Sequence, residues 1–291
     1  MKGGIIESIV IEKLADNKRA YDSLNGKFEK IPSRKALKKL LDKGLVYNGN
    51  VALKSGDHLM IGDVVHLYEE IKHPNSIYRK KIEVLFEDPH IAIIIKPAGV
   101  VVSGNRFKSI YNMLPHNLQP SKEYDALVSP QPVHRLDELT SGLLIVAKTH
   151  RARVKLGYDF EKNNITKTYI AICHGYLNAH GVINQQVNFK HAQTKFETLD
   201  TWNDALGKCY SMLSLSPVTG RKHQIRIHLS SIGHPILGDL KYCNKQSTIR
   251  KKGLFLFAKE VVFNHPVSNQ TLSFHAPLPN KFKRIKQLQI K

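Results

Sequence analysis

Asp137 is the residue of this sequence best suited to covalent chemistry. It closes the run His134-Arg135-Leu136-Asp137, which is followed by a polar turn at Thr140-Ser141-Gly142 and then by an apolar stretch. Cationic neighbours favour the ionised form of a carboxyl group, and an ionised, positioned carboxylate can attack an electrophilic carbon. An Asp can also cap a turn, so spacing alone leaves a nucleophile and a turn cap as equal alternatives.

A second group of candidate residues follows the turn at Gly220. Donor side chains alternate there with apolar ones in Arg221-Lys222-His223-Gln224-Ile225-Arg226-Ile227-His228. Guanidinium and ammonium groups at this density can hold phosphates or pair with a carboxylate. The alternative is the exposed start of an ordinary surface helix.

The charge of the chain indicates which kind of partner such residues would meet. Its 291 residues carry a formal net charge of +20, and the sequence pI is about 9.8. This excess favours a polyanionic partner, and nucleic acid is the commonest polyanion for a protein of this kind. The alternative is a charge that serves only solubility.

Other compositional features argue against several classes of protein. No apolar run reaches the length of a bilayer span, and the first residues carry no cleavage signature, so we expect a cytoplasmic protein without membrane contact. The three cysteines, at positions 173, 209 and 243, form no CxxC pair, which favours reduced thiols over disulfides. The fifteen histidines show no HExxH or similar spacing, so we expect no metal site.

Two further positions have both a structural and a functional interpretation. Tyr169 follows Lys167-Thr168 in an expected strand, where β-propensity favours a core residue. Its ring could instead stack on a nucleic-acid base. For Lys96-Pro97-Ala98-Gly99 we prefer a plain structural turn at the end of a strand.

The elements that must position these residues follow from hydrophobic periodicity. Short apolar runs predict strands at residues 64–68, 82–86, 91–95, 143–147, 167–173, 210–215, 254–258 and 271–274. Helical spacing predicts helices at about 150–162 and about 222–232. Many short strands without regular βαβ alternation indicate an α+β fold with a largely antiparallel sheet.

A smaller basic module is predicted at residues 31–70. Ser33 can cap a helix after Pro32, and Leu37 and Leu41 recur at helical spacing behind it. A dense set of cations shares that helix, namely Arg34, Lys35, Lys38, Lys39 and Lys43. They could contact phosphates, or they could form an ordinary solvated face.

The polar segment 69–79, which contains the Pro74-Asn75 break, is predicted to be a linker. We therefore predict two domains, at residues 1–75 and 80–291. Residues 1–30 give no clear prediction of their own.

Across roughly residues 80–280 the sequence resembles the RluA-type family of pseudouridine synthases. The segments that carry the resemblance are, in order, IIIKPAGV, HRLDELTSGLLIVAK, TKTYIAICHG, PVTGRKHQIRIHL, GHPILGD and FNHPVSNQTLSFHAPLP. The HRLD–TSG block followed by TGRxHQIRxH is the most specific part. Residues 31–70 resemble the small RNA-binding module named for ribosomal protein S-four.

The resemblance implies a mixed-sheet α+β catalytic core, the pseudouridine synthase fold, and isomerisation of uridine in RNA without cofactor or metal. It implies that Asp137 is the nucleophile and that Arg226 pairs with it. It also implies that Arg135 helps to extrude the target base and that Tyr169 packs on that base. We further expect substrate binding by Lys167, Arg221, His223 and Gln224, and RNA binding by Arg34, Lys35, Lys38 and Lys39.

The leading hypothesis is therefore a monomeric enzyme that converts specific uridines in structured RNA, ribosomal RNA before transfer RNA. A non-catalytic RNA-binding protein and a carboxylate hydrolase for small molecules are the two alternatives. The sequence leaves open whether the carboxylate attacks the ribose carbon, attacks the base or abstracts a sugar proton.

Overall fold

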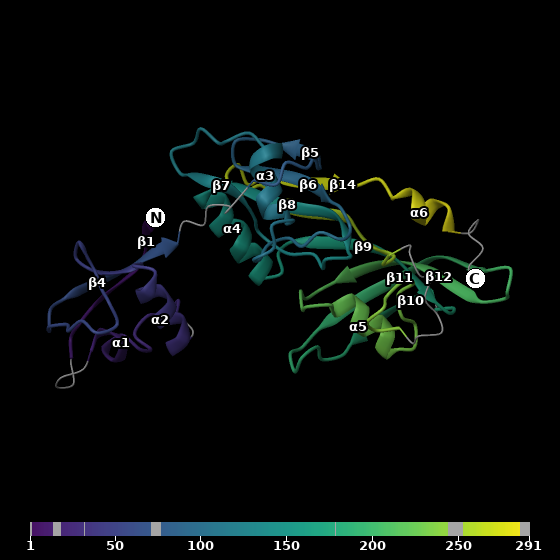
Figure 1. Cartoon of the computed structure of the whole chain (residues 1–291). Helices are drawn as coiled ribbons and strands as arrows, with labels where there is room; N and C mark the ends of the chain where they lie inside the picture. The colour runs from purple at the N-terminus through teal and green to yellow at the C-terminus, as the bar shows by residue number, and fades with distance from the viewer. Residues whose placement is uncertain are drawn as a thin grey trace. The chain divides into compact units, whose positions relative to one another are not determined.

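The computed structural model describes residues 2–13, 19–31, 33–70, 77–177, 179–243 and 253–285. The chain divides into two compact units, Met1–His73 and Pro74–Lys291 (Figure 1). Pro32 and the predicted Pro74-Asn75 break lie outside the described residues.

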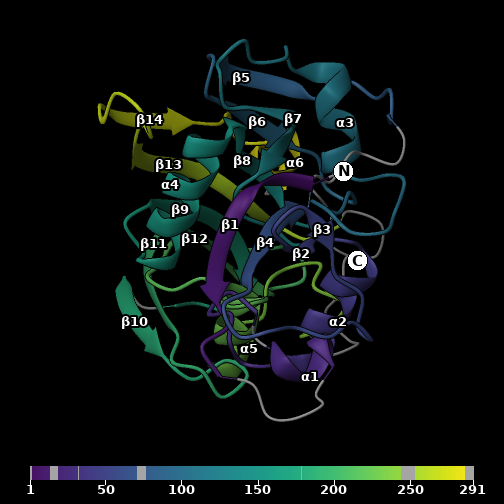
Figure 2. The ribbon, with the colours of Figure 1, turned by 90° about the vertical axis from the view of Figure 1, so that its left-hand side faces the viewer.

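The small unit is built on a four-stranded antiparallel sheet in the order β1-β4-β2-β3. Figure 2 shows its long strands β1 and β4 side by side. Its elements are β1 (Lys2–Val10), α1 (Ala20–Ser23), α2 (Arg34–Asp42), β2 (Val46–Asn48), β3 (Val51–Ala52) and β4 (Val64–Glu70).

Helix α2 has one apolar and one basic face, as its sequence predicts. The hydroxyl of Ser33 accepts a hydrogen bond from the backbone N–H of Ala36 at 3.2 Å, which confirms the predicted N-cap. Leu37 and Leu41 are buried in the apolar cluster of the small unit. The cations of α2 therefore lie on the solvent side.

The large unit contains a ten-stranded sheet in the order β10-β11-β12-β9-β13-β8-β6-β5, with β14 paired to β13 and β7 paired to β8. All pairs are antiparallel except β8–β13, so the sheet is mixed and largely antiparallel, which confirms the predicted fold class. Among the described residues, no helix has the length and apolarity needed to cross a membrane.

The strands of the large unit are β5 (Glu83–Glu87), β6 (Ile91–Lys96), β7 (Ala126–Pro132), β8 (Ser141–Thr149), β9 (Thr166–His174), β10 (His180–Asn184), β11 (Gln193–Asn203), β12 (Cys209–Pro217), β13 (Leu256–Asn264) and β14 (Thr271–His275). Its helices are α3 (Ile110–Asn117), α4 (His150–Glu161), α5 (Gln224–Ser231) and α6 (Asn280–Lys283). In Figure 1, α4 lies close to β8, and α5 lies close to β11 and β12.

The central strands β6 and β8 are covered on both faces. Ile93 and Ile145 belong to one apolar cluster, whereas their neighbours Ile94 and Val146 belong to another. Successive side chains of a strand point to opposite faces, so the two clusters lie on the two sides of the sheet. Burial on both faces explains why these strands read as continuous apolar runs.

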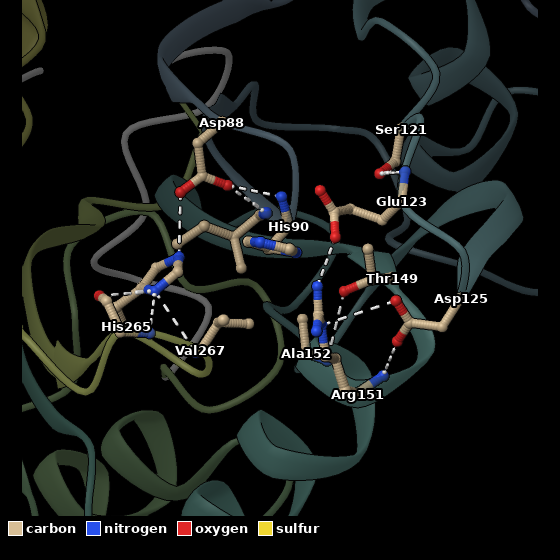
Figure 3. A network of polar contacts seen from close by, with 12 residues as sticks. Asp88, His90, Ser121, Glu123, Asp125, Thr149, Arg151, Ala152, His265 and Val267 are labelled. Atoms are coloured by element: carbon tan, nitrogen blue, oxygen red, sulfur yellow. Dashed lines mark hydrogen bonds and ion pairs between the residues drawn. The ribbon is translucent and has the colours of Figure 1, made fainter.

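Polar contacts hold the turns at one end of this sheet (Figure 3). Asp88, between β5 and β6, accepts hydrogen bonds from the backbone N–H of His90 and from the Nε2–H of His265, between β13 and β14. At the start of α4, Arg151 pairs with Glu123 and with Asp125. These contacts join segments that are far apart along the chain.

Candidate active site

A cavity of about 460 Å³ opens beside Asp137 in the large unit. Its walls come mainly from residues 133–140, 160–169 and 217–226. All eight residues predicted for catalysis or substrate binding line it: Arg135, Asp137, Lys167, Tyr169, Arg221, His223, Gln224 and Arg226. The fold thus brings together three segments that are separated in the sequence.

The carboxylate of Asp137 faces one guanidinium and one imidazole group. Its Oδ2 lies 3.2 Å from Nη1 of Arg226, and its Oδ1 lies 3.6 Å from Nε2 of His223. The turn into β8 is closed by the backbone carbonyl of Asp137, which accepts from the N–H of Thr140 at 3.1 Å. Because the backbone carbonyl makes this bond, the carboxylate is not needed to close the turn. The Asp137 side chain is 15% exposed and lines the cavity.

A second, fully buried carboxylate orients Arg226. Asp239 accepts two hydrogen bonds from it, from Nε at 2.7 Å and from Nη2 at 2.9 Å. Burial disfavours the charge on Arg226, but its bonds to Asp239 and Asp137 outweigh this and raise the pKa of Arg226. Burial alone would raise the pKa of Asp239, but Arg226 and two backbone N–H groups lower it.

His223 approaches the other oxygen of Asp137 from the start of α5. It has a left-handed backbone conformation, with φ 59°, and its Nδ1 lies 2.8 Å from the hydroxyl oxygen of Tyr242. Burial lowers the pKa of His223, while the charge of Asp137 opposes this shift. The geometry fixes the imidazole against the carboxylate.

Lys96, at the end of β6, holds the loop that carries Asp137. Its fully buried ammonium donates to the carbonyls of Pro97 at 2.9 Å and Glu138 at 3.0 Å. The N–H of Gly99 donates to the same Glu138 carbonyl at 2.8 Å. Burial lowers the pKa of Lys96 to about 8, against the opposing charges of Asp137 and Glu138.

The rings of His134, Phe160 and Tyr169 also line the cavity. Tyr169 is half-buried, and burial together with the charge of Asp137 raises its pKa, so its hydroxyl stays neutral. His134 stacks on Phe160 with ring centroids 4.5 Å apart, and burial lowers its pKa to about 3. The ammonium of Lys167 lies 5.8 Å from the Phe160 ring centroid, and burial lowers its pKa too.

The remaining cavity residues differ in how free their side chains are. Arg135 is exposed. Arg221 is also exposed, but its Nε donates to the carbonyl of His191 at 3.1 Å. Gln224 is buried, and its amide bonds to the hydroxyl groups of Thr219 at 2.6 Å and Thr194 at 3.0 Å. Gln224 thus holds the loop in place, and its predicted contact with substrate stays a prediction.

The predicted RNA-binding residues lie apart in sequence, on α2 of the small unit. Arg34, Lys35, Lys38 and Lys39 are all exposed. Arg34 pairs with Asp22 and lies 5.0 Å from the ring centroid of Tyr21, so it is more constrained than the lysines. Their contact with RNA stays a prediction.

Three residues of the site were not recognised from the sequence, namely Lys96, Asp239 and Tyr242. Lys96 is the last residue of an otherwise apolar strand. A lysine at the end of such a strand could have indicated a buried cation. Asp239 appears in the sequence analysis only as the last residue of the GHPILGD segment, with no role of its own. Its partner Arg226 lies 13 residues away, and only the fold shows that the two side chains meet.

Comparison with known proteins agrees with this geometry. The family model described as RNA pseudouridylate synthase matches residues 90–231. The dual-specificity RNA pseudouridine synthase RluA of Haemophilus influenzae is 33% identical over 220 residues, which cover 67% of this chain and 92% of that protein. The ribosomal large subunit pseudouridine synthase D of Vibrio cholerae is 30% identical over 280 residues, covering 85% and 84%.

The solved structure of human RNA pseudouridylate synthase domain containing 1 aligns with a TM-score of 0.58. The alignment covers 69% of this chain and 85% of that chain at 22% sequence identity, so it shows the shared fold. Together with the sequence matches, it establishes that the chain belongs to the RNA pseudouridylate synthase family and is an RNA pseudouridine synthase, an isomerase.

Proposed function

We propose that this enzyme isomerises specific uridines in structured RNA, with ribosomal RNA preferred to transfer RNA, and that Asp137 is its nucleophile. The observation that carries the proposal is the ion pair between Asp137 and Arg226 at 3.2 Å inside the cavity. A volume of about 460 Å³ lies within the range of roughly 300–1,000 Å³ typical of small-ligand sites, so one extruded nucleoside can be accommodated.

The reaction needs one nucleophile and a site that retains the detached base. The bond from C1′ of the ribose to N1 of uracil breaks, the ring turns, and C1′ bonds to C5. C5 loses a proton and N1 gains one, so the product is an isomer of the substrate. A closed site keeps the free ring next to its own sugar. Each of the three routes left open by the sequence begins with an ionised carboxylate.

The neighbours of Asp137 suit these requirements. Arg226 donates a hydrogen bond to the carboxylate of Asp137 and, because Asp239 holds Arg226, fixes that carboxylate in one orientation. The ring of Tyr169 gives the uracil a flat surface. Extruding a base from stacked RNA costs roughly a few kcal/mol, and the exposed Arg135 can offset part of this by filling the vacated space.

The preference for ribosomal RNA rests on the relatives. Vibrio cholerae proteins named ribosomal large subunit pseudouridine synthases C and D are each 30% identical to this chain, and each alignment covers more than 80% of both chains. The two alternative functions weighed from the sequence lose their support, because the family consists of enzymes that act on RNA.

The test compares Asp137→Asn with Glu138→Gln in the full-length protein. Asn keeps the size of the side chain but cannot act as the anionic nucleophile, so pseudouridine formation should fall by several orders of magnitude while RNA binding persists. Glu138 is a matched control, because its carboxylate pairs with Arg106 at the surface at 2.8 Å. Chemical mapping of transcribed ribosomal and transfer RNA measures the product.

Glu138→Gln should modify RNA at close to the wild-type rate. An Asp137→Asn enzyme with undiminished activity would remove Asp137 from the role of nucleophile. Modification of transfer RNA with no modification of ribosomal RNA would overturn the proposed preference.

A further inference from the structure

The chain between β10 and β11 contains a two-residue turn with an unusual occupant. The N–H of Val187 donates to the carbonyl of Lys190 at 2.9 Å, and the N–H of Lys190 donates back to Val187 at 3.2 Å. The two central residues, Asn188 and Phe189, have φ of 51° and 61°. Positive φ at both central positions is the pattern of a type I′ turn.

Phe189 is a poor choice for this position on structural grounds alone. Type I′ turns strongly favour Asn-Gly, and a bulky residue with positive φ is an outlier. The Phe189 side chain is also 97% exposed, so burial of its ring does not offset the unfavourable backbone conformation. Strained positions of this kind cluster where a ligand is bound.

The segment that carries Phe189 is basic. Lys190 directly follows Phe189 and is exposed, Lys195 in the same segment is also exposed, and residues 185–195 contain no acidic side chain. An exposed ring next to a cation in such a segment has the chemistry of a stacking site on single-stranded nucleic acid.

The same segment is bonded to the wall of the catalytic cavity. Arg221, which lines the cavity, donates from Nε to the carbonyl of His191 at 3.1 Å. The N–H of Val218 donates to the carbonyl of Gln193 at 2.9 Å, and the amide of Gln224 donates to the same carbonyl at 2.9 Å. These bonds hold the segment that follows the turn against the loop that carries Arg221.

We propose that Phe189 stacks on an unpaired RNA base outside the cavity, close to the target uridine, while Lys190 and Arg221 contact the adjacent phosphates. Phe189 is thereby a substrate-positioning residue that helps to select unpaired target regions. The inference rests on the proposed function, because the ring acts on the RNA whose uridine enters the cavity.

The experiment measures Kd for a transcribed substrate RNA, together with kcat and KM, in full-length variants. Phe189→Ala should raise Kd and KM about tenfold, an effect within the range reported for removal of one base–aromatic stack, and should leave kcat nearly unchanged. Phe189→Tyr retains a ring and should restore both constants. Leu206→Ala is the matched control, because Leu206 is 66% exposed in the hairpin turn at the other end of β11.

A glycine variant separates binding from folding. Phe189→Gly relieves the positive φ, so it should raise the midpoint of thermal unfolding while it raises Kd as the alanine variant does. A Kd of Phe189→Ala equal to that of the wild type would overturn the stacking inference. So would an equal increase in Kd for Leu206→Ala, or a loss of kcat without a change in Kd.

Failure of the proposed function has a different signature. Asp137→Asn would then keep the wild-type activity, or transfer RNA would be modified while ribosomal RNA was not. The stacking inference is decided by the Kd values alone.

Discussion

At the scale of residues, two carboxylates share the guanidinium of Arg226, and only one of them faces the cavity. Asp239 is fully buried and takes the bidentate contact, whereas Asp137 takes a single contact at 3.2 Å. Removal of one partner of a buried ion pair lowers the free energy of unfolding by about 3–5 kcal/mol. The bidentate pair with Asp239 therefore keeps Arg226 in one position. The orientation of Asp137 therefore depends on a residue that does not face the substrate.

Burial of the neutral His134 ring should make the free energy of unfolding depend on pH. Its Nε2 accepts a hydrogen bond from the backbone N–H of Ile145 at 3.0 Å, and burial lowers the pKa of His134 to about 3. Between pH 3 and 6.5 the unfolded chain therefore binds more protons than the folded one. The contribution of His134 to the free energy of unfolding should fall by about 1.4 kcal/mol for each pH unit below 6.5.

His134→Gln removes the titrating ring and should remove this slope. We expect the difference in unfolding free energy between wild type and variant to shrink as pH falls from 7 to 5, measured by denaturant titration. His180→Gln, at an exposed position in β10, is the control and should follow the wild type. Parallel curves for wild type and His134→Gln would contradict the assignment.

At the scale of elements, the parallel contact between β8 and β13 positions the loop that carries Asp137. Gly142 pairs with Ala258 directly after the turn that carries Asp137, and its φ is +117°. A Cβ at Gly142 would lie 2.2 Å from the carbonyl oxygen of Ala258. The two strands can approach this closely only because residue 142 has no side chain.

Gly142→Ala should therefore both destabilise the fold and reduce activity. We expect the free energy of unfolding to fall by about 2–4 kcal/mol, because the backbone of β13 must move and the positive φ disfavours alanine. Gly157→Ala is the matched control, because Gly157 lies in α4 with open space around it. It should stabilise the helix by about 0.5–1 kcal/mol. Equal midpoints of thermal unfolding for Gly142→Ala and Gly157→Ala would contradict this account.

At the scale of the whole molecule, the net charge of +20 and the exposed lysines of α2 predict salt-sensitive binding of RNA. Phosphate contacts release counterions, so each one steepens the dependence of affinity on salt. Lys35, Lys38 and Lys39 are exposed, whereas Leu37 and Leu41 of the same helix are buried, so the lysines can be changed without removing a buried side chain.

The variant Lys35→Ala/Lys38→Ala/Lys39→Ala should weaken RNA binding and make the slope of log K against log salt shallower by about 2 to 3, roughly 0.7–0.9 for each lost phosphate contact. The unfolding of the variant should match the wild type. Removal of three exposed lysines of the large unit, Lys80, Lys108 and Lys122, is the control and should change the slope less. Equal slopes for wild type and the α2 variant would refute a role for this helix in RNA binding.

Features with local causes were predictable from the sequence. The two-sided burial of β6 and β8 produces continuous apolar runs, and the Ser33 cap depends on a bond over three residues. The strands β7 and β11 and the helix α3 were not predicted. Strand β7 contains two prolines and α3 contains Pro115. Strand β11 is mostly polar, and its large apolar residues, Phe196, Leu199 and Trp202, do not recur at a period of two, so none of the three elements carries a strong local signal.

By itself, the sequence determined the class of fold, the basic character of the molecule and, through the order of its motifs, the residues around Asp137. Only the tertiary structure decided that Asp239 orients Arg226, that Lys96 supports the Glu138 carbonyl and that the side chain of Phe189 is exposed. Asp239 and Arg226 are 13 residues apart in the sequence, and Lys96 and Glu138 are 42 residues apart. The exposure of Phe189 depends on which parts of the fold cover its segment. Whether such groups meet depends on strand register and on how the sheet is covered, and neither is written in a local pattern of residues.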